Sequence, residues 1–137
     1  MHALGLENAQ GFTFGSGFYW DQNAAAREWS QRFFAEQKAM PTRVQGAVFT
    51  STRHFLKAIN QAGSRDTAAV NKAMRAMPVD YLGRPGSVRA DGRVLYDLSV
   101  YRVKSPAQSR APWDYYQQIG TVSAQDAFLP MNPACAI

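Results

Sequence analysis

The feature that most constrains the fold is an apolar stretch between residues 40 and 63. Pro41 stands just outside its expected start. Thr42 and Gln45, three residues apart, form a capping box in which each side chain satisfies the other residue's backbone N–H. Gly63 suits the C-terminal end because glycine adopts a positive φ without strain. A helix of about 20 residues is roughly 30 Å long, so the sequence predicts one helix that crosses a whole small domain.

Apolar side chains cover most of this helix. One face carries a row at i, i+3/i+4 spacing, and further apolar positions widen it. The row consists of Val44, Val48, Phe55, Ile59 and Ala62, with Ala47, Leu56 and Ala58 beside it. Because so little polar surface remains, we expect the helix to be packed on several sides and to lie inside the molecule.

Length and composition fit one globular domain. The chain has 137 residues, of which 46% are hydrophobic and 18% charged, and this balance separates it from disordered and membrane-embedded chains. No apolar run approaches the roughly 18 residues of a transmembrane helix. The first residues lack the basic start and long apolar core of a signal peptide. The sequence alone therefore predicts a cytoplasmic chain, unless an export signal belongs to a part outside it.

The net charge of +5 leaves two interpretations open for the region 84–110. Its basic residues could bind nucleic acid or an acidic partner, or they could form the solvated face of a hairpin. They are scattered, with no block of five or six like charges, which favours the solvated face. The residues concerned are Arg84, Arg89, Arg93, Arg102, Lys104 and Arg110.

Two further helices are predicted on either side of the long one. The first is capped by Asp21 or Asn23 and ends near Lys38. Its apolar stripe is Ala25, Ala26, Trp29 and Phe33. The second follows Asp66 as its N-cap and stops before Pro78. Its apolar face is Ala69, Val70, Ala73, Met74 and Met77.

Strands are predicted before and after the helices. A short strand covers 12–14, and an Asp-Gly turn at 91–92 indicates a hairpin. Its second strand alternates over 94–103, and a last strand over 113–122 could pair with it in antiparallel fashion. The order is strand, three helices, β-hairpin and strand, which belongs to the α/β class.

No catalytic or metal-binding constellation is recognisable in the sequence. There is no nucleophile elbow, and no Cys, His or carboxylate spacing matches a zinc or calcium site. His2 is terminal, and His54 reads as an ordinary helix histidine. An enzyme is therefore the least favoured class, and no cofactor is expected.

The passage from Gly15 to Trp20 is the best candidate for a binding segment. Its glycine spacing does not match a phosphate-binding loop. Flexible backbone followed by Phe18, Tyr19 and Trp20 indicates a hinge or a ligand-facing segment. For Phe18, packing in the core is an equally good interpretation.

Cys135 is the one cysteine and cannot form a disulfide within this chain. It is an inert thiol, an intermolecular bridge, or half of a bridge whose partner lies outside the sequence. We expect a free thiol, so that oxidation links two chains through this residue; a non-reducing gel without dimer, together with no thiol labelling, would contradict this.

Several segments taken together resemble a known family. In order and spacing they are similar to the C-terminal third of ABC-transporter substrate-binding proteins of the branched-chain amino acid (Leu/Ile/Val) type, with the type I periplasmic binding fold. The segments are residues 11–14, 18–21, 27–34, 40–42, 54–58, 88–93, 104–106 and 112–116. The resemblance covers nearly the whole chain.

The resemblance implies a partial fold. Members have two α/β lobes joined by three crossing strands, and most of their parallel sheet is lacking here. Residues 1–18 and 98–137 would supply second-lobe and hinge segments, and 19–97 the first-lobe helices and hairpin. With its partner segments missing, the isolated chain is expected to self-associate.

The resemblance also implies a function. Members bind amino acids or related small carboxylates between the lobes in the periplasm, pass them to a membrane permease, and perform no chemistry on them. In the parent, Tyr19 and Trp20 would line the cleft, and Gln45 and Phe49 would face it from the helix N-terminus. Alternatively, Gln45 is occupied by the capping box and Trp20 belongs to the core. The competing class is a small basic interaction module that binds nucleic acid or an acidic partner.

Overall fold

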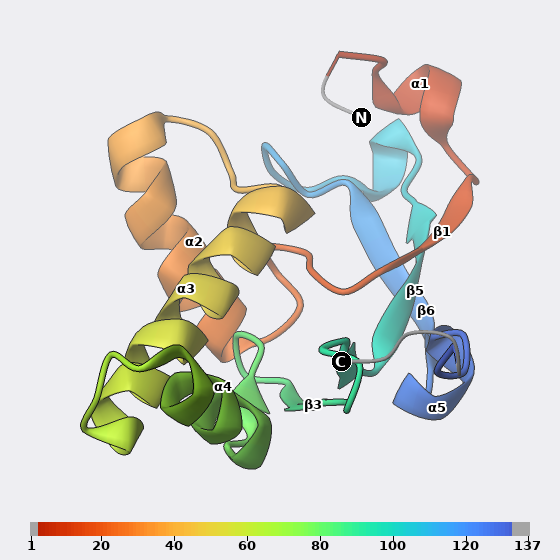
Figure 1. The fold of residues 1–137 in the computed structure, drawn as a ribbon. Coiled ribbons are helices and arrows are strands. Elements are labelled where there is room, and N and C mark those ends of the chain that lie inside the picture. The colour runs from red at the N-terminus through yellow and green to blue at the C-terminus, as the bar shows by residue number, and fades with distance from the viewer. Residues whose placement is uncertain (1–2, 133–137) are drawn as a thin grey trace.

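The computed structural model describes residues 3–132, so that His2 and Cys135 lie outside the described part (Figure 1). The described chain is built from helices and two small antiparallel sheets. In order the elements are α1 (Leu6–Ala9), β1 (Thr13–Ser16), α2 (Ala24–Gln37), α3 (Arg43–Ala62), α4 (Thr67–Ala76), β2 (Val79–Asp80), β3 (Pro85–Val88), β4 (Val94–Tyr96), β5 (Leu98–Val103), the 3-10 turn η1 (Pro106–Gln108), β6 (Tyr116–Val122) and α5 (Ala124–Ala127). The α/β class and the partial character of the fold are thus confirmed.

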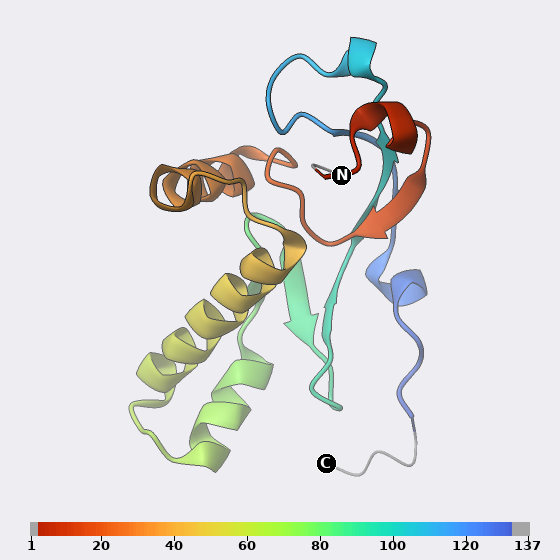
Figure 2. The same ribbon diagram turned by 90° about the horizontal axis from the view of Figure 1, so that it is seen from above.

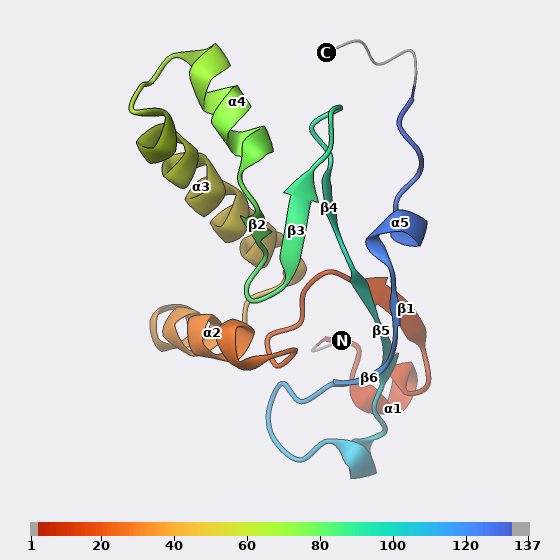
Figure 3. The same cartoon turned by 90° about the horizontal axis from the view of Figure 1, so that it is seen from below.

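The two sheets occupy different parts of the molecule. One has the order β2-β3-β4 and lies beside α3 and α4, and the other has the order β1-β5-β6 (Figure 3). Seen from above, α2, α3 and α4 stand on one side and the β1-β5-β6 sheet with α5 on the other (Figure 2). All strand pairs of the described residues are antiparallel.

The predicted strand over 94–103 is divided at Asp97 between the two sheets. The Asp97 carbonyl accepts a hydrogen bond of 2.9 Å from Nη1 of Arg84. Its carboxylate accepts one of 2.8 Å from the backbone N–H of Ala124, at the start of α5. The bonds to Arg84 and Ala124 thus engage both the backbone and the side chain of Asp97. The chain passes from one sheet to the other at this single residue.

The ends of α3 agree with the prediction. Thr42 is the N-cap, and its backbone N–H donates to Oε1 of Gln45 over 2.9 Å. The N–H of Val44 donates to the Thr42 hydroxyl over 3.3 Å. Gly63 ends the helix with φ 58°, in the left-handed region that glycine tolerates best. Local capping chemistry therefore sets both ends of the longest helix.

The predicted buried face of α3 is largely wrong: of its eight positions only Ala58 is buried, and Ile59 and Ala62 are half-buried. The helix packs through a strip of small and polar residues at i, i+4 spacing, namely Gly46, Thr50, His54 and Ala58. Gly46 lies under the ring of Phe18, because a Cβ there would stand 3.0 Å from a ring carbon. Nε2 of His54 lies 2.9 Å from the carbonyl oxygen of Met74 in α4. Small side chains let the neighbouring elements approach closely, which explains why this strip is the packed one.

The large apolar row of α3 faces outward, and the helix is not enclosed on several sides. The exposed fractions are 61% for Val44, 60% for Val48, 45% for Phe55 and 58% for Leu56. Phe55, with Ile59, borders a hollow against Val70 and Met74 of α4, whereas Val44, Val48 and Leu56 stay mostly exposed. The periodicity correctly predicts an apolar face, but the described chain covers only part of it.

The flanking helices mostly follow the sequence. For α2 the cap is Asn23, whose side chain accepts from the N–H of Ala26 over 2.8 Å, whereas Asp21 pairs with Arg27 over 2.9 Å. For α4 the cap is Asp66, as predicted, and it accepts from Ala69 over 2.9 Å. Among the described helices none is long and apolar enough to cross a membrane.

The Asp-Gly turn also forms as predicted, with Val88 opposite Val94 in the β3–β4 hairpin. The short strand β2 was not expected, because glycine and proline in the region 79–86 suggested irregular chain. The core lies where α2, α3 and the β2-β3-β4 sheet meet. It consists of Phe18, Ala26, Trp29, Tyr81 and Leu82, with Trp20, Phe33, Phe49 and Tyr96 packed against it.

Candidate ligand-binding site

A hollow of about 590 Å³ lies between the start of α3 and the β1-β5-β6 sheet. Four stretches of chain line it: β1, the aromatic segment that follows it, the approach to α3, and the segment leading into β6. The lining residues are Phe14, Gly15, Ser16, Phe18, Tyr19, Trp20, Met40, Pro41, Thr42, Arg43, Trp113, Tyr115 and Tyr116. Aromatic side chains thus form most of its walls, as in many small-molecule sites.

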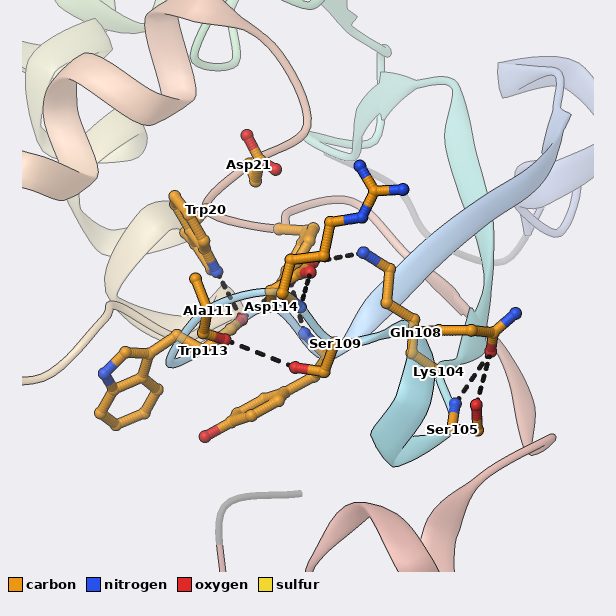
Figure 4. A network of polar contacts seen from close by, with 12 residues as sticks. Trp20, Asp21, Lys104, Ser105, Gln108, Ser109, Ala111, Trp113 and Asp114 are labelled. Carbon is orange, nitrogen blue, oxygen red and sulfur yellow. Dashed lines mark hydrogen bonds and ion pairs between the residues drawn. The ribbon is translucent and has the colours of Figure 1, made fainter.

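The carbonyl of Trp113 joins two of these stretches. It accepts a hydrogen bond of 2.9 Å from the hydroxyl of Tyr19 and one of 2.8 Å from Nε1 of Trp20. The Tyr19 hydroxyl in turn accepts from the backbone N–H of Tyr115 over 3.0 Å. Figure 4 shows the indole nitrogen of Trp20 pointing to the backbone of Trp113. The aromatic segment after β1 is therefore fixed to the segment before β6.

Trp113 itself adopts φ 69°. A bulky residue rarely takes a positive φ, and such strain persists only where the surroundings hold it. Here the two donors, Tyr19 and Trp20, hold its carbonyl in place. Strained backbone of this kind tends to occur at ligand sites.

An ion pair stiffens the loop between β5 and β6. Nζ of Lys104 binds Oδ1 of Asp114, and the N–H of Arg110 donates to Oδ2 over 3.0 Å (Figure 4). Burial alone would raise the pKa of Asp114, but the hydrogen bonds from Lys104 and Arg110 outweigh it and lower that pKa. Asp114 is therefore a carboxylate at neutral pH, and it orients the segment that carries Trp113.

Burial raises the pKa of the Tyr19 hydroxyl to about 12. Burial also raises the pKa of Tyr116, on the same wall. Both phenols are thus neutral at physiological pH, and Tyr19 can donate and accept at once. The rings pack on one another, with centroids 4.8 Å apart between Tyr19 and Tyr116 and 4.9 Å apart between Phe14 and Tyr116. The wall is neutral, aromatic and closely packed.

The four residues expected from the sequence lie in two places. Tyr19 and Trp20 line the hollow. Gln45 is exposed and engaged in the capping box with Thr42. Phe49 stacks on Trp29 at 4.9 Å on the core side of α3. The structure brings Tyr19 and Trp20 together but leaves Gln45 and Phe49 outside the lining.

Other lining residues were missed by the sequence reasoning. Trp113, Tyr115 and Tyr116 were assigned only to a strand, although they repeat the aromatic clustering of residues 18–20. The predicted antiparallel pairing of that strand with residues 94–103 was the sequence feature from which their place beside β5 could have been inferred. Phe18, left open between hinge and core, is 4% exposed and packs edge-on against Trp29, with ring centroids 5.7 Å apart. Within residues 3–132 no group of three His, Cys, Asp or Glu side chains could hold a metal ion.

Comparison with known proteins identifies the family of this chain. The periplasmic binding protein family matches residues 1–110, and the chain belongs to that family. A periplasmic binding protein from Burkholderia mallei is 39% identical, with a TM-score of 0.90. A branched chain amino acid ABC transporter periplasmic ligand-binding protein from Burkholderia xenovorans is 32% identical, with a TM-score of 0.89. A comparison with curated proteins finds no match.

These matches cover nearly all of this chain but only part of each relative. The alignments cover 93% and 94% of this chain but only 34% and 35% of the two Burkholderia proteins. An amino acid ABC transporter substrate-binding protein from Pseudomonas fluorescens has the same fold, with a TM-score of 0.84 at 23% identity, and 36% of it is covered. The chain thus spans about a third of the length of the solved structures it matches, and the expected resemblance to branched-chain amino acid binding proteins is confirmed.

Proposed function

We propose that this chain is the C-terminal part of the solute-binding component of an ABC uptake transporter. Its role is to help hold an amino acid or a related small carboxylate, without chemical conversion. The observation that carries the proposal is the aromatic hollow of about 590 Å³ beside α3, in a chain of the periplasmic binding protein family. Concave sites with apolar walls and a few polar groups are typical of small-molecule binding.

The two sheets support a division of the chain between two lobes. Residues 1–18 and 98–137 would belong to the second lobe and hinge, and 19–97 to the first lobe. In favour of this, β1 pairs with β5 in one sheet, while β2, β3 and β4 form the other. The change of sheet at Asp97 falls at the proposed boundary. The hollow would then be part of the cleft between the lobes.

Four residues are proposed as ligand contacts: Tyr19, Trp20, Gln45 and Phe49. The lining of the hollow supports Tyr19 and Trp20. For Gln45, ligand binding would replace the hydrogen bond that its side chain accepts from Thr42. For Phe49, ligand contact would require the ring to move from its stack on Trp29 and from the Arg53 guanidinium, which lies over it 5.4 Å from the centroid.

The proposed partner is a membrane permease, and the proposed location is the periplasm. The descriptions of the two Burkholderia proteins, a periplasmic binding protein and an ABC transporter periplasmic ligand-binding protein, support both. Nucleic acid is not part of the proposal. Arg84 binds Asp97 and Ser99, and Arg89 binds Asp91, so two central cations of the basic region have partners within the chain.

Ligand binding in a full-length context tests the proposal. A chimera in which this chain replaces the matching third of the Burkholderia xenovorans protein should bind an L-amino acid or a small carboxylate in calorimetry. Tyr19→Ala and Gln45→Ala should each weaken binding, whereas Arg102→Gln, on an exposed position of β5, should not. A folded chimera that binds nothing in such a panel would refute the proposal. Unchanged affinity in both alanine variants would remove those residues from the site.

A further inference from the structure

Arg43 brings a positive charge to a hollow whose other walls are mainly aromatic. It is the first residue of α3 and lines the hollow together with Met40, Pro41 and Thr42. Among the described lining residues none is Asp or Glu, so the lining carries one net positive charge. Burial raises the pKa of Tyr19 and of Tyr116, so that both phenols are neutral at physiological pH.

The guanidinium of Arg43 makes no hydrogen bond, ion pair or ring contact within residues 3–132, although its charge acts on the buried phenol of Tyr81. Most other arginines of the described chain are engaged; the exposed Arg65 and Arg102, which lie outside the hollow, are not. The engaged ones pair as Arg27 with Asp21, Arg53 with Asp80, and Arg89 with Asp91, while Arg84 binds the hydroxyl of Ser99 and Arg93 lies over Phe128. Arg43 keeps its five N–H donors available at the edge of the hollow.

The position of Arg43 is also unfavourable for the helix itself. The N-terminus of a helix carries a partial positive charge, and a cation in the first turn is repelled by it. The first turn of α3 contains no acidic residue to offset this. The helix end and the guanidinium therefore add their positive potentials at the same side of the hollow, which attracts an anion. A planar carboxylate matches the guanidinium in bidentate geometry.

We propose that Arg43 binds the carboxylate of a ligand whose aromatic or apolar body lies against Tyr19, Trp20 and Tyr116. The inference rests on the proposed ligand-binding role of the hollow and adds to it the residue that recognises charge. Charge complementarity selects the anion, and stacking on the aromatic walls selects the body. Arg43 contributes to specificity for acids over their neutral analogues.

Two probes of almost equal size separate charge from shape: phenylacetate and its neutral amide, phenylacetamide. Their binding to the full-length chimera described above is measured by saturation-transfer-difference NMR titration, which suits weak ligands. Phenylacetate should bind roughly tenfold more tightly than phenylacetamide, the size expected for one charge-assisted contact. Arg43→Gln should weaken phenylacetate by about that factor and leave phenylacetamide unchanged.

Three variants serve as controls. Arg43→Lys keeps the charge but loses the bidentate geometry, so it should retain part of the preference for the acid. Arg102→Gln removes a cation outside the hollow and should retain all of it. Because Arg43 opposes the helix dipole, Arg43→Gln should leave the melting temperature equal or slightly raised, so that lost binding cannot be ascribed to misfolding.

The outcomes distinguish the inference from the function beneath it. An unchanged ratio of the two affinities in Arg43→Gln overturns the role of Arg43 and leaves the proposed function standing. A saturation-transfer signal from L-leucine, with none from phenylacetate or phenylacetamide, would likewise overturn the role of Arg43 and leave the proposed function standing. Silence from all three compounds also overturns the inference if the chimera binds another compound of the calorimetric panel, whereas a folded chimera that binds nothing at all refutes the proposed function itself.

Discussion

The two long faces of α3 differ in what the chain provides for them. One face consists of Gly46, Thr50, His54 and Ala58, and it is packed against Phe18, α4 and their neighbours. The other carries Val44, Val48, Phe55 and Leu56, each between 45% and 61% exposed. Both follow helical periodicity, yet the described chain packs closely on the first and borders the second only at Phe55, beside α4. An apolar stripe shows that a helix requires a partner, but it does not show that the partner lies in the same sequence.

The length of the relatives gives the open face its context. The chain covers about 34% of a homologous structure, and we expect part of the remaining two thirds to lie on Val44, Val48, Phe55 and Leu56. A continuous apolar surface of this kind is unusual for a monomer and drives association. Three predictions separate the packed face from the open one, and a fourth concerns the hairpin; they follow in order of decreasing effect.

The largest effect concerns the open face and the state of association. We predict that the isolated chain is oligomeric or aggregates, and that it binds amino acids weakly or not at all. Replacing Val48 and Phe55 by lysine should shift it strongly toward monomer, because two charges then interrupt the apolar row. Light scattering and a thermal-shift screen measure this. A cooperative wild-type monomer that an amino acid stabilises by several degrees would show that the chain is self-sufficient.

The second effect concerns the core under the packed face. Trp29 stacks on Phe49 and meets Phe18 edge-on, and Trp29→Ala should cost about 3–5 kcal/mol of unfolding free energy. Phe55→Ala, on the open face, is the matched control and should change it by less than about 1 kcal/mol. Chemical denaturation of both variants measures the difference. Equal losses would mean that the open face is buried in solution.

A smaller effect is expected at the closest approach of the packed face. The methyl group of Gly46→Ala would meet the ring of Phe18 at 3.0 Å. Overpacking of this kind costs about 1–3 kcal/mol, partly offset by about 1 kcal/mol of better helix propensity. Ser51→Ala, at an exposed helix position, should be neutral or slightly stabilising. Stabilisation by Gly46→Ala would show that Phe18 can move away from α3.

The smallest effect lies away from α3, in the hairpin. A hydrogen bond from Arg89 lowers the pKa of Asp91 from its ordinary 3.8 to about 2. Because the folded pKa is the lower one, this contribution is present above about pH 4 and is lost as the pH falls toward 2. Asp91→Asn should therefore be less stable than wild type at pH 5, and the difference should be much smaller at pH 2. Thermal melts at both pH values test this; a constant difference would argue against the ion pair.

Local signals predicted α3 well, whereas its surroundings could not be read from the sequence. Thr42, Gln45 and Gly63 set the helix ends through contacts within a few residues, and those ends are correct. The choice of buried face depends on Phe18 and α4, and on whether other parts of the protein are present. Periodicity alone carries no information about either.

The candidate site shows the same contrast between residues that local sequence predicts and residues that only the fold brings together. Tyr19 and Trp20 could be proposed because aromatic residues follow flexible glycines within one short segment. Trp113, Tyr115 and Tyr116 reach the same hollow through the pairing of β5 with β6. Arg43 was not among the residues proposed from the sequence. Its meaning depends on the lack of a partner and on the walls nearby, and both are properties of the folded chain.

The shared carbonyl of Trp113 has a consequence for the order of folding. Its bonds to Tyr19 and Trp20 join residues 94 and 93 positions apart. Closing a loop of that length costs on the order of 4 kcal/mol in chain entropy, whereas α3 and α4 are neighbours along the chain. Contacts of long sequence separation form slowly, and segments with few supporting contacts open first. The helical pair should therefore acquire hydrogen-exchange protection early, and the hollow should assemble late and open before the rest of the molecule unfolds.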